Sequence, residues 1–196
     1  YQSSRELIRL CARAIRAIHR EEWTAAEALI AEARGATQEL VAGVQEFPEL
    51  YFAGYTQDAI KEFVEANLTY ALVRNRPLPR PEDLDAEYNP WLNGLAEAAT
   101  ELRRRILDII RHGHSDEAER LLDSMDQIYS MLVTFDFNDS ITGGLRRRTD
   151  TVRAVLERTR GDITTSLRQA ELEQALEALE IRLRDLSVVE NEDSSE

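Results

Sequence analysis

Cysteine is almost absent from this 196-residue chain, and so are long apolar runs. The single Cys11 excludes an internal disulfide and is typical of a protein in a reducing compartment, so we expect a cytoplasmic location. No apolar run approaches the length of a membrane span, and no signal-peptide pattern is found at the start. These absences argue against a disulfide-stabilised secreted domain and against a membrane partner.

Lysine is equally scarce: Lys61 is the only one, and the other 23 of the 24 basic residues are arginine. Acidic residues number 37, so the formal net charge is −13. Such a composition is typical of proteins in concentrated salt, where a Debye length of about 3 Å at 1 M screens like-charge repulsion. We therefore expect a halophilic protein, whose acidity does not argue against a nucleic-acid partner. The alternative is an ordinary acidic protein in which GC-rich codon usage replaced lysine by arginine.

Convincing period-two alternation of apolar residues is also missing, and apolar residues recur instead at spacings of three and four. We predict an all-α fold, a single-domain antiparallel bundle of about seven helices over residues 1–187. Residues 188–196 are acidic and serine-rich and are predicted to form a disordered tail. Prolines in the segment 76–81 predict a stiff connector, followed by a helical turn at 82–84, and Gly161 is predicted to end the sixth helix. The predicted helices span 3–20, 22–42, 50–75, 91–111, 115–135, 145–160 and 163–185.

Two predicted helices each carry a pair of acids at helical spacing. Glu62 and Glu65 lie three residues apart among apolar neighbours, and Glu97 and Glu101 lie four apart in the next helix. Each pair occupies one helix face, so two antiparallel helices can bring the four carboxylates together. Carboxylate oxygens suit Mg²⁺ or Mn²⁺, and such a site is typical of a metal-dependent phosphodiesterase. The alternative is that these acids form salt bridges with nearby arginines.

Arginines form the only basic clusters, and the first helix carries four of them at offsets of four, three and four. The guanidinium group donates paired hydrogen bonds to phosphate, so these four are candidate nucleic-acid-binding residues. They are Arg9, Arg13, Arg16 and Arg20. Further runs occupy 103–105 and 146–148, and aromatic residues at 51, 52 and 55 offer stacking surfaces for a single strand. The alternative is that these arginines pair with the abundant acids.

Two stretches resemble the hallmark motifs of the translin superfamily. Residues 61–66 read KEFVEA, which is similar to the family's Gln-Glu-Tyr-Val-Glu-Ala motif. Residues 91–104 read WLNGLAEAATELRR, which is similar to Tyr-Leu-x-Gly-Val-Ala-Asp-x-x-x-Glu-Leu-x-Arg. Weaker similarities lie at 13–20 and 150–161, so the resemblance extends to about residue 185. Within the family the chain resembles translin-associated factor X, because Glu62 and Glu97 stand where translin has apolar residues.

The resemblance implies a seven-helix bundle that assembles into closed oligomers, typically octamers, around single-stranded RNA or DNA. It also implies an Mg²⁺-dependent endoribonuclease whose site is the motif acids. One difference concerns Glu97, because the family usually has the shorter aspartate at that position.

The expected function is therefore a single-stranded nucleic-acid-binding protein with Mg²⁺-dependent endoribonuclease activity in a homo-oligomeric shell, with an octamer expected. Glu62, Glu65 and Glu97 are the predicted catalytic residues, and with Glu101 they are the predicted ligands of Mg²⁺ or Mn²⁺. The substrate is expected to be single-stranded RNA, with DNA as the alternative. Two rival functions are a non-catalytic translin-like binder of single-stranded DNA or RNA, and a structural helical oligomer whose acids only form salt bridges.

Overall fold

The structure is a computed structural model that describes residues 1–113 and 115–193. Every regular element in these residues is a helix, which confirms the predicted all-α fold. The elements are α1 (Gln2–His19), α2 (Trp23–Val44), α3 (Pro48–Tyr51), α4 (Gly54–Val73), the 3₁₀ helix η1 (Pro81–Leu84), α5 (Tyr88–Ile110), α6 (Asp116–Leu132), α7 (Asp139–Thr142) and α8 (Leu145–Asp193). Among the described residues, no helix combines the length and the apolar character that crossing a membrane requires.

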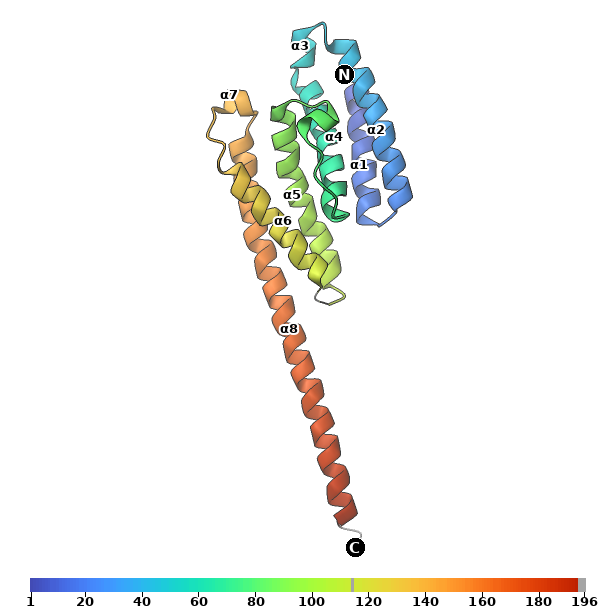
Figure 1. The fold of residues 1–196 in the computed structure, drawn as a ribbon, viewed down its shortest axis with the longest axis vertical. Helices are drawn as coiled ribbons and strands as arrows, with labels where there is room; N and C mark the ends of the chain where they lie inside the picture. The colour runs from blue at the N-terminus through green and yellow to red at the C-terminus, as the bar shows by residue number, and fades with distance from the viewer. Residues whose placement is uncertain (114, 194–196) are drawn as a thin grey trace.

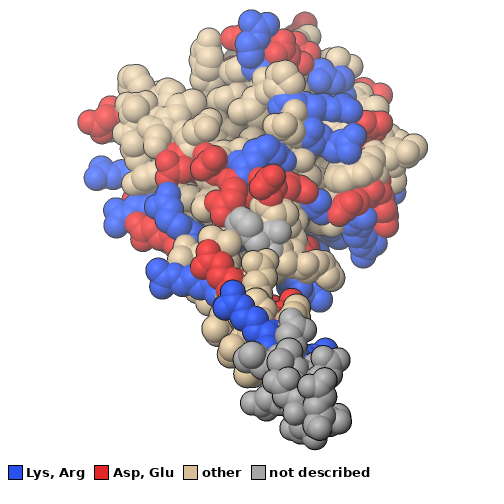
Figure 2. Space-filling view, turned by 60° about the horizontal axis from the view of Figure 1, so that its bottom comes forward, with Lys and Arg blue, Asp and Glu red and all other residues tan. Residues whose placement is uncertain are grey.

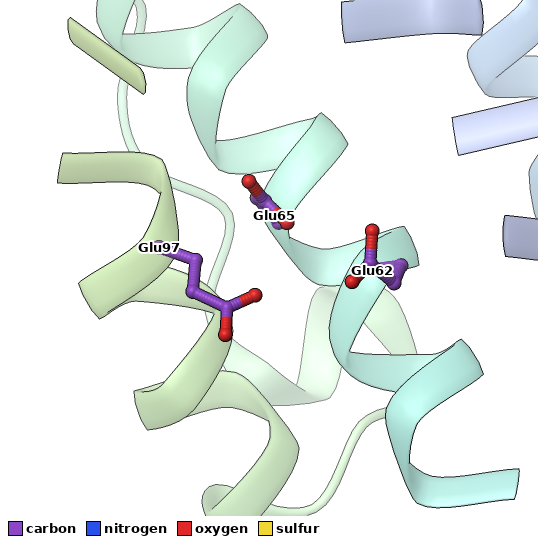
Figure 3. Close-up of side chains that lie close together, drawn as sticks. All are labelled: Glu62, Glu65 and Glu97. Carbon is purple, nitrogen blue, oxygen red and sulfur yellow. The ribbon is translucent and has the colours of Figure 1, made fainter. Parts of the chain in front are cut away.

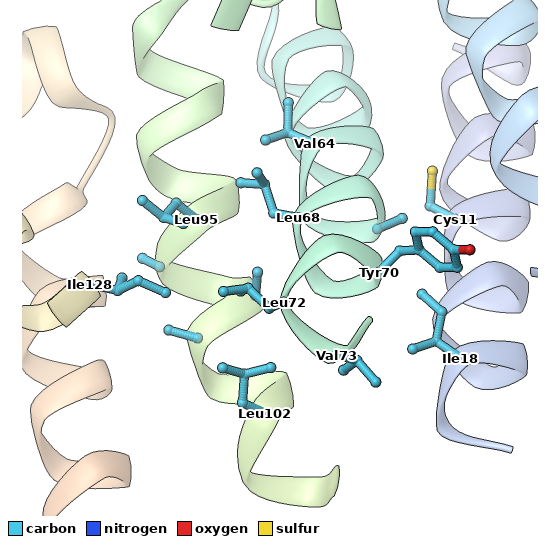
Figure 4. Packing of buried hydrophobic residues seen from close by; sticks show 14 of the residues in the cluster. Cys11, Ile18, Val64, Leu68, Tyr70, Leu72, Val73, Leu95, Leu102 and Ile128 are labelled. Atoms are coloured by element: carbon cyan, nitrogen blue, oxygen red, sulfur yellow. The ribbon is translucent and has the colours of Figure 1, made fainter. Parts of the chain in front are cut away.

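Helix α4 lies at the centre of the bundle, with α1 and α2 on one side and α5 on the other (Figure 1). Its sequence is apolar around most of its circumference, and this pattern is typical of a helix that is buried on several sides. Val64, Leu68 and Leu72 face α5, while Tyr70 points toward α1, where Cys11 and Ile18 are buried (Figure 4). Helices α6 and α8 pack against α5 on the far side. The acids of the KEFVEA motif are therefore carried by the most enclosed helix of the bundle.

Helix α4 approaches α5 closely at Gly94. A Cβ atom there would lie 2.8 Å from Val64 Cγ1 and 2.9 Å from the Lys61 carbonyl oxygen. Only a residue without a side chain fits this separation, so Gly94 sets the distance between the two helices that carry the acidic pairs.

We predict that Gly94→Ala destabilises the protein by about 1–3 kcal/mol, because the added methyl group must push α5 away from the α4 backbone. Thermal unfolding followed by circular dichroism measures this change. Gly35→Ala in the middle of α2 is the matched control, because its Cβ atom would meet nothing within 4 Å. It should stabilise the protein by about 0.5–1 kcal/mol through helix propensity alone. Equal effects of the two substitutions would contradict the close-approach role of Gly94.

Two predicted helix boundaries were wrong. The helix predicted over 50–75 is interrupted after α3, because Ala53 is extended with ψ 139°. The last carbonyl groups of a helix lack intrahelical partners. The hydroxyl group of Thr56 donates a hydrogen bond to one of them, the Leu50 carbonyl of α3, at 2.8 Å. The helices predicted over 145–160 and 163–185 form the single helix α8, since Gly161 keeps helical geometry. A lone glycine costs a helix only about 1 kcal/mol, which does not force an end.

The predicted turn at 82–84 agrees with the structure, because these residues lie in η1. Helix α6 begins after Ser115, whose side chain caps it by accepting a hydrogen bond from the Ala118 amide. The backbone of α8 is helical as far as Asp193, whereas 194–196 lie outside the described residues. The domain limits predicted at 187 and 188, and the tail predicted over 188–196, stay predictions.

Candidate metal centre

Three of the four predicted acids converge between α4 and α5. Glu62 and Glu65 project from α4 toward Glu97 of α5 (Figure 3). Each contributes one carboxylate oxygen to a group in which all atoms lie within 4.8 Å of one another. Glu65 is buried, and the other two are half-buried, so the cluster has one enclosed side and one side open to solvent. Three carboxylate oxygens are donors of the type that a hard divalent cation prefers.

Glu65 carries the strongest electrostatic perturbation of the cluster. Burial raises the pKa of the Glu65 carboxyl to about 9, and the negative charges of Glu62, Glu97 and Glu101 act in the same direction. The same field reaches α1, where burial together with Glu62 and Glu65 raises the pKa of the Cys11 thiol to about 12. Without a divalent cation, Glu65 is therefore neutral at pH 7. A cation bound to all three acids would have to displace its proton.

Glu97 has the opposite perturbation, because two cationic side chains hold it. Burial opposes ionisation, but hydrogen bonds from Arg148 and Lys61 outweigh it and hold the pKa of Glu97 below its usual value. The Lys61 ammonium lies 2.6 Å from Glu97 Oε2 and 3.2 Å from Glu62 Oε1. On the other side, Arg148 Nε lies 2.8 Å from Glu97 Oε1.

Arg148 is itself fixed by the end of α7. Its Nη1 atom donates to the Gly143 carbonyl at 3.0 Å and to Asn93 Oδ1 at 3.2 Å. The side-chain Nδ2 atom of Asn93 in turn donates a hydrogen bond to the Thr142 carbonyl at 2.7 Å. Gly143 caps α7 with φ +60°, a conformation that glycine adopts without strain. This network links α5, α7 and α8 and orients the Glu97 carboxylate.

Sequence reasoning missed Lys61, Arg148 and Asn93 as parts of the site. Lys61 and Asn93 lie within the two motifs. The sequence signal for Lys61 is that it is the only lysine of the chain. Arg148 is 51 residues from Glu97, so no spacing rule connects the two.

Glu101 does not belong to the group of converging oxygens in the described residues. It lies one turn further along α5, where its Oε2 atom is 2.7 Å from His19 Nε2 at the end of α1. Its charge still contributes to the raised pKa of Glu65. The role of Glu101 as a fourth ligand stays a prediction.

The four arginines predicted to bind nucleic acid are exposed, three of them along α1 and Arg20 at its C-terminal cap. Helical periodicity places them opposite the buried stripe of Leu7, Cys11, Ala14 and Ile18. In the part of the chain whose side chains are described, none of Arg9, Arg13, Arg16 and Arg20 forms an ion pair. They are free to contact a phosphate backbone, yet within one protomer they face away from the carboxylate cluster. The face in Figure 2 shows acidic and basic side chains interspersed, without one broad basic patch.

We predict that the metal-free protein loses stability as pH rises from about 4.5 to about 9, the pKa values of an ordinary glutamate and of Glu65. Over this window the unfolded chain has released the Glu65 proton while the folded chain still holds it, so folding becomes less favourable with rising pH. Glu65→Gln has no proton to release, so it lacks this pH-dependent loss of stability. It should be more stable than wild type at pH 9 by about 1–3 kcal/mol. Calorimetric unfolding in chelator at pH 5, 7 and 9 measures it. Exposed Glu39→Gln is the control and should follow wild type.

The protein is an all-helical bundle in which two neighbouring helices, α4 and α5, bring three carboxylates close together. No protein-family model matches the chain. "Uncharacterized protein MJ0175" of Methanocaldococcus jannaschii is 33% identical over 185 residues, which are 92% of this chain and 80% of that protein. The crystal structure of AfC3PO and the structure of its complex with duplex RNA are each 32% identical, with TM-scores of 0.80. Each comparison covers 87% of this chain and 88% of that chain.

The apo structure of NeC3PO is 19% identical with a TM-score of 0.77, over 84% of this chain and 86% of that one, and shows the same fold. AfC3PO and NeC3PO are translin-family structures. The chain belongs to the translin superfamily, which confirms the family suggested by its two motifs.

Proposed function

We propose that this protein is a metal-dependent endoribonuclease of the factor X type, acting on single-stranded RNA. The observation that supports it is the convergence of Glu62, Glu65 and Glu97 at the α4–α5 contact. Acids at positions 62 and 97 also support the proposal, because the chain resembles translin-associated factor X there, whereas translin has apolar residues at both positions. We propose Mg²⁺ or Mn²⁺ as the cofactor, with Glu101 as a further ligand.

A divalent cation at such a site makes a bound water more acidic and offsets the charge that develops on a phosphate. The residues of the chain prepare this chemistry in different ways. Glu65 would have to release its proton to hold a cation, whereas Glu97 is already ionised and held in one orientation by Arg148. The half-buried Glu62 lies toward the open side, where a phosphate can approach.

The proposed RNA partner is supported by AfC3PO, which has been solved with duplex RNA. For this chain we propose single strands as the substrate, bound in part by the α1 arginines. Each phosphate contact that these arginines form should steepen the salt dependence of binding by slightly less than one unit of log–log slope. Filter binding of single- and double-stranded RNA, and of single-stranded DNA, between 0.1 and 1 M salt compares the candidate partners.

We propose assembly into a closed homo-oligomer, with an octamer expected, and α8 supports an interface between copies. Its outer part carries four leucines at offsets of four, three and four, which is the spacing of a coiled-coil seam. Leu172, Leu176, Leu179 and Leu183 are between 51% and 59% exposed. Figure 1 shows this part of α8 extending beyond the rest of the bundle. A second copy of the chain is the occupant that we propose for this seam.

We predict that the double substitution Leu176→Glu and Leu179→Glu reduces the molar mass measured by light scattering at least twofold, because four charges across a paired seam repel one another. Gln174→Glu with Ala178→Glu adds the same charge off the seam and should leave the mass unchanged. An unchanged mass for the leucine variant would place the interface elsewhere.

The non-catalytic single-strand binder is the second candidate, and the Lys61 ammonium favours it. This group already neutralises part of the acidic cluster, as expected of a site that no longer needs a metal. Incubation with labelled single-stranded RNA, with Mg²⁺ or with chelator, separates the two candidates. Cleavage that requires Mg²⁺ supports the nuclease, whereas retention of intact RNA under both conditions supports the binder.

A further inference from the structure

The only lysine of this chain lies inside the carboxylate cluster. Its side chain is 11% exposed, and its ammonium contacts Glu62 and Glu97, which are two of the three converging acids. All 23 other basic side chains are guanidinium groups, so this compact cation stands alone in the chain.

Lys61 contacts oxygens that a divalent cation would need. Glu97 Oε2 lies 2.6 Å from the ammonium, and Arg148 engages the other oxygen of the same carboxylate. Both oxygens of Glu97 therefore contact cationic side chains, and one oxygen of Glu62 contacts the Lys61 ammonium. A metal ion that binds Glu97 and Glu62 together has to compete with the ammonium for negative charge and for lone pairs.

The flexibility of the lysine side chain allows the ammonium to leave. A Cβ atom at Gly94 would lie 2.9 Å from the Lys61 carbonyl oxygen, so the backbone of Lys61 lies close to α5. The side chain has a flexible four-carbon stem, and rotation about its bonds can carry the charge toward solvent without moving either helix. Arginine, with its planar fork, would hold a carboxylate through two parallel bonds and would be harder to displace.

We propose that Lys61 is a built-in counter-cation that occupies the carboxylate cluster of the metal-free protein and is displaced when a divalent cation binds. Lys61 thereby sets the metal affinity of the site and keeps the acids from repelling one another when no metal is present. This inference rests on the proposed metal-dependent function and adds the regulation of its site.

Calorimetric titration of the full chain with Mn²⁺ tests the competition. Lys61→Gln should bind Mn²⁺ at least about tenfold more tightly than wild type, because the competing charge is gone. Lys61→Arg should bind no more tightly than wild type. Arg168→Gln removes one positive charge from an exposed position on α8 and should leave the affinity unchanged. Thermal unfolding adds a second readout: Lys61→Gln should melt lower than wild type in chelator and regain that loss in Mn²⁺.

The isolation of Lys61 allows a test on the unaltered protein, which stays decisive if Lys61→Gln does not fold. Lysine labelled with ¹³C at Cε yields one side-chain resonance in the spectrum, because the chain has one lysine. Titration with diamagnetic Mg²⁺ should move this resonance toward the shift of a solvated lysine until the site is saturated.

Three outcomes overturn the inference, and they separate it from the proposed function. Unchanged or weaker Mn²⁺ affinity in a folded Lys61→Gln variant removes the competition while leaving the metal site intact. A lysine resonance that does not respond to saturating Mg²⁺ shows that the ammonium stays in place. Absence of Mn²⁺ binding in wild type and all variants overturns both this inference and the metal-dependent function.

Discussion

Glu65→Gln should lower Mg²⁺-dependent RNA cleavage by about a thousandfold or more, while RNA binding stays within about twofold of wild type. The substitution removes a candidate ligand without changing the size of the side chain. Burial and neighbouring acids keep Glu65 neutral in the metal-free protein, so a neutral amide reproduces the state that the fold already accommodates. The variant should therefore fold normally and lose only the negative charge that a cation requires. Single-turnover cleavage of end-labelled single-stranded RNA measures the loss, and filter binding in chelator measures the affinity.

The control for this experiment is Glu39→Gln, which removes a carboxylate from the exposed face of α2 and should cleave at the wild-type rate. Mg²⁺-dependent cleavage by Glu65→Gln at the wild-type rate would contradict the assignment of the α4–α5 cluster as the active site. A parallel loss of cleavage and binding would instead indicate that the variant disturbs the RNA surface.

The fold class was predictable because helical periodicity is a property of local sequence. Spacings of three and four recur along most of the chain, and the observed helices follow them. The boundary errors have a physical cause: glycine and polar residues change a helix by only about 1 kcal/mol, and tertiary contacts decide the result. Gly161 lies inside α8 for this reason, whereas the break after α3 depends on Thr56 reaching back to Leu50.

The acids of the site were predictable only in part. Spacing placed each pair on one helix face, and the motif order suggested that the two faces meet. The convergence of Glu62, Glu65 and Glu97 agrees with that expectation, although their roles as ligands stay predictions. Glu101 turns to His19 instead, because α1 ends beside it, and no local pattern reveals that contact. The partners of Glu97 come from positions that only the folded chain brings together.

Those partners explain how one cluster holds a neutral and an ionised acid side by side. Glu65 is buried and lies among negative charges, whereas Glu97 accepts hydrogen bonds from Lys61 and Arg148. This asymmetry shifts the pKa values of the two acids in opposite directions. It also means that the acids differ in what they need for metal binding: Glu65 must lose a proton, while Glu97 must release a cationic partner.

Arg148→Met should lower Mg²⁺-dependent cleavage by about 10- to 100-fold, the usual cost of removing a group that orients a metal ligand. Arg148 touches Glu97 rather than the proposed metal position, so the loss should come from misorientation and altered charge of that carboxylate. Without the guanidinium the pKa of Glu97 rises, and the acidic limb of the pH–rate profile should move to higher pH. Cleavage rates at saturating Mg²⁺ between pH 5 and 9 measure both effects.

Arg158→Met is the matched control, since it removes an exposed arginine from the same helix and should shift neither the rate nor the profile. A rate loss in Arg148→Met without a shift of the acidic limb would mean that Arg148 supports the end of α7 and not the ionisation of Glu97. Asn93→Ala tests that alternative directly, because Asn93 links Arg148 to the Thr142 carbonyl without contacting Glu97 through any hydrogen bond among the described residues. If the network only orients Arg148, Asn93→Ala should lower the rate less than Arg148→Met and leave the acidic limb in place.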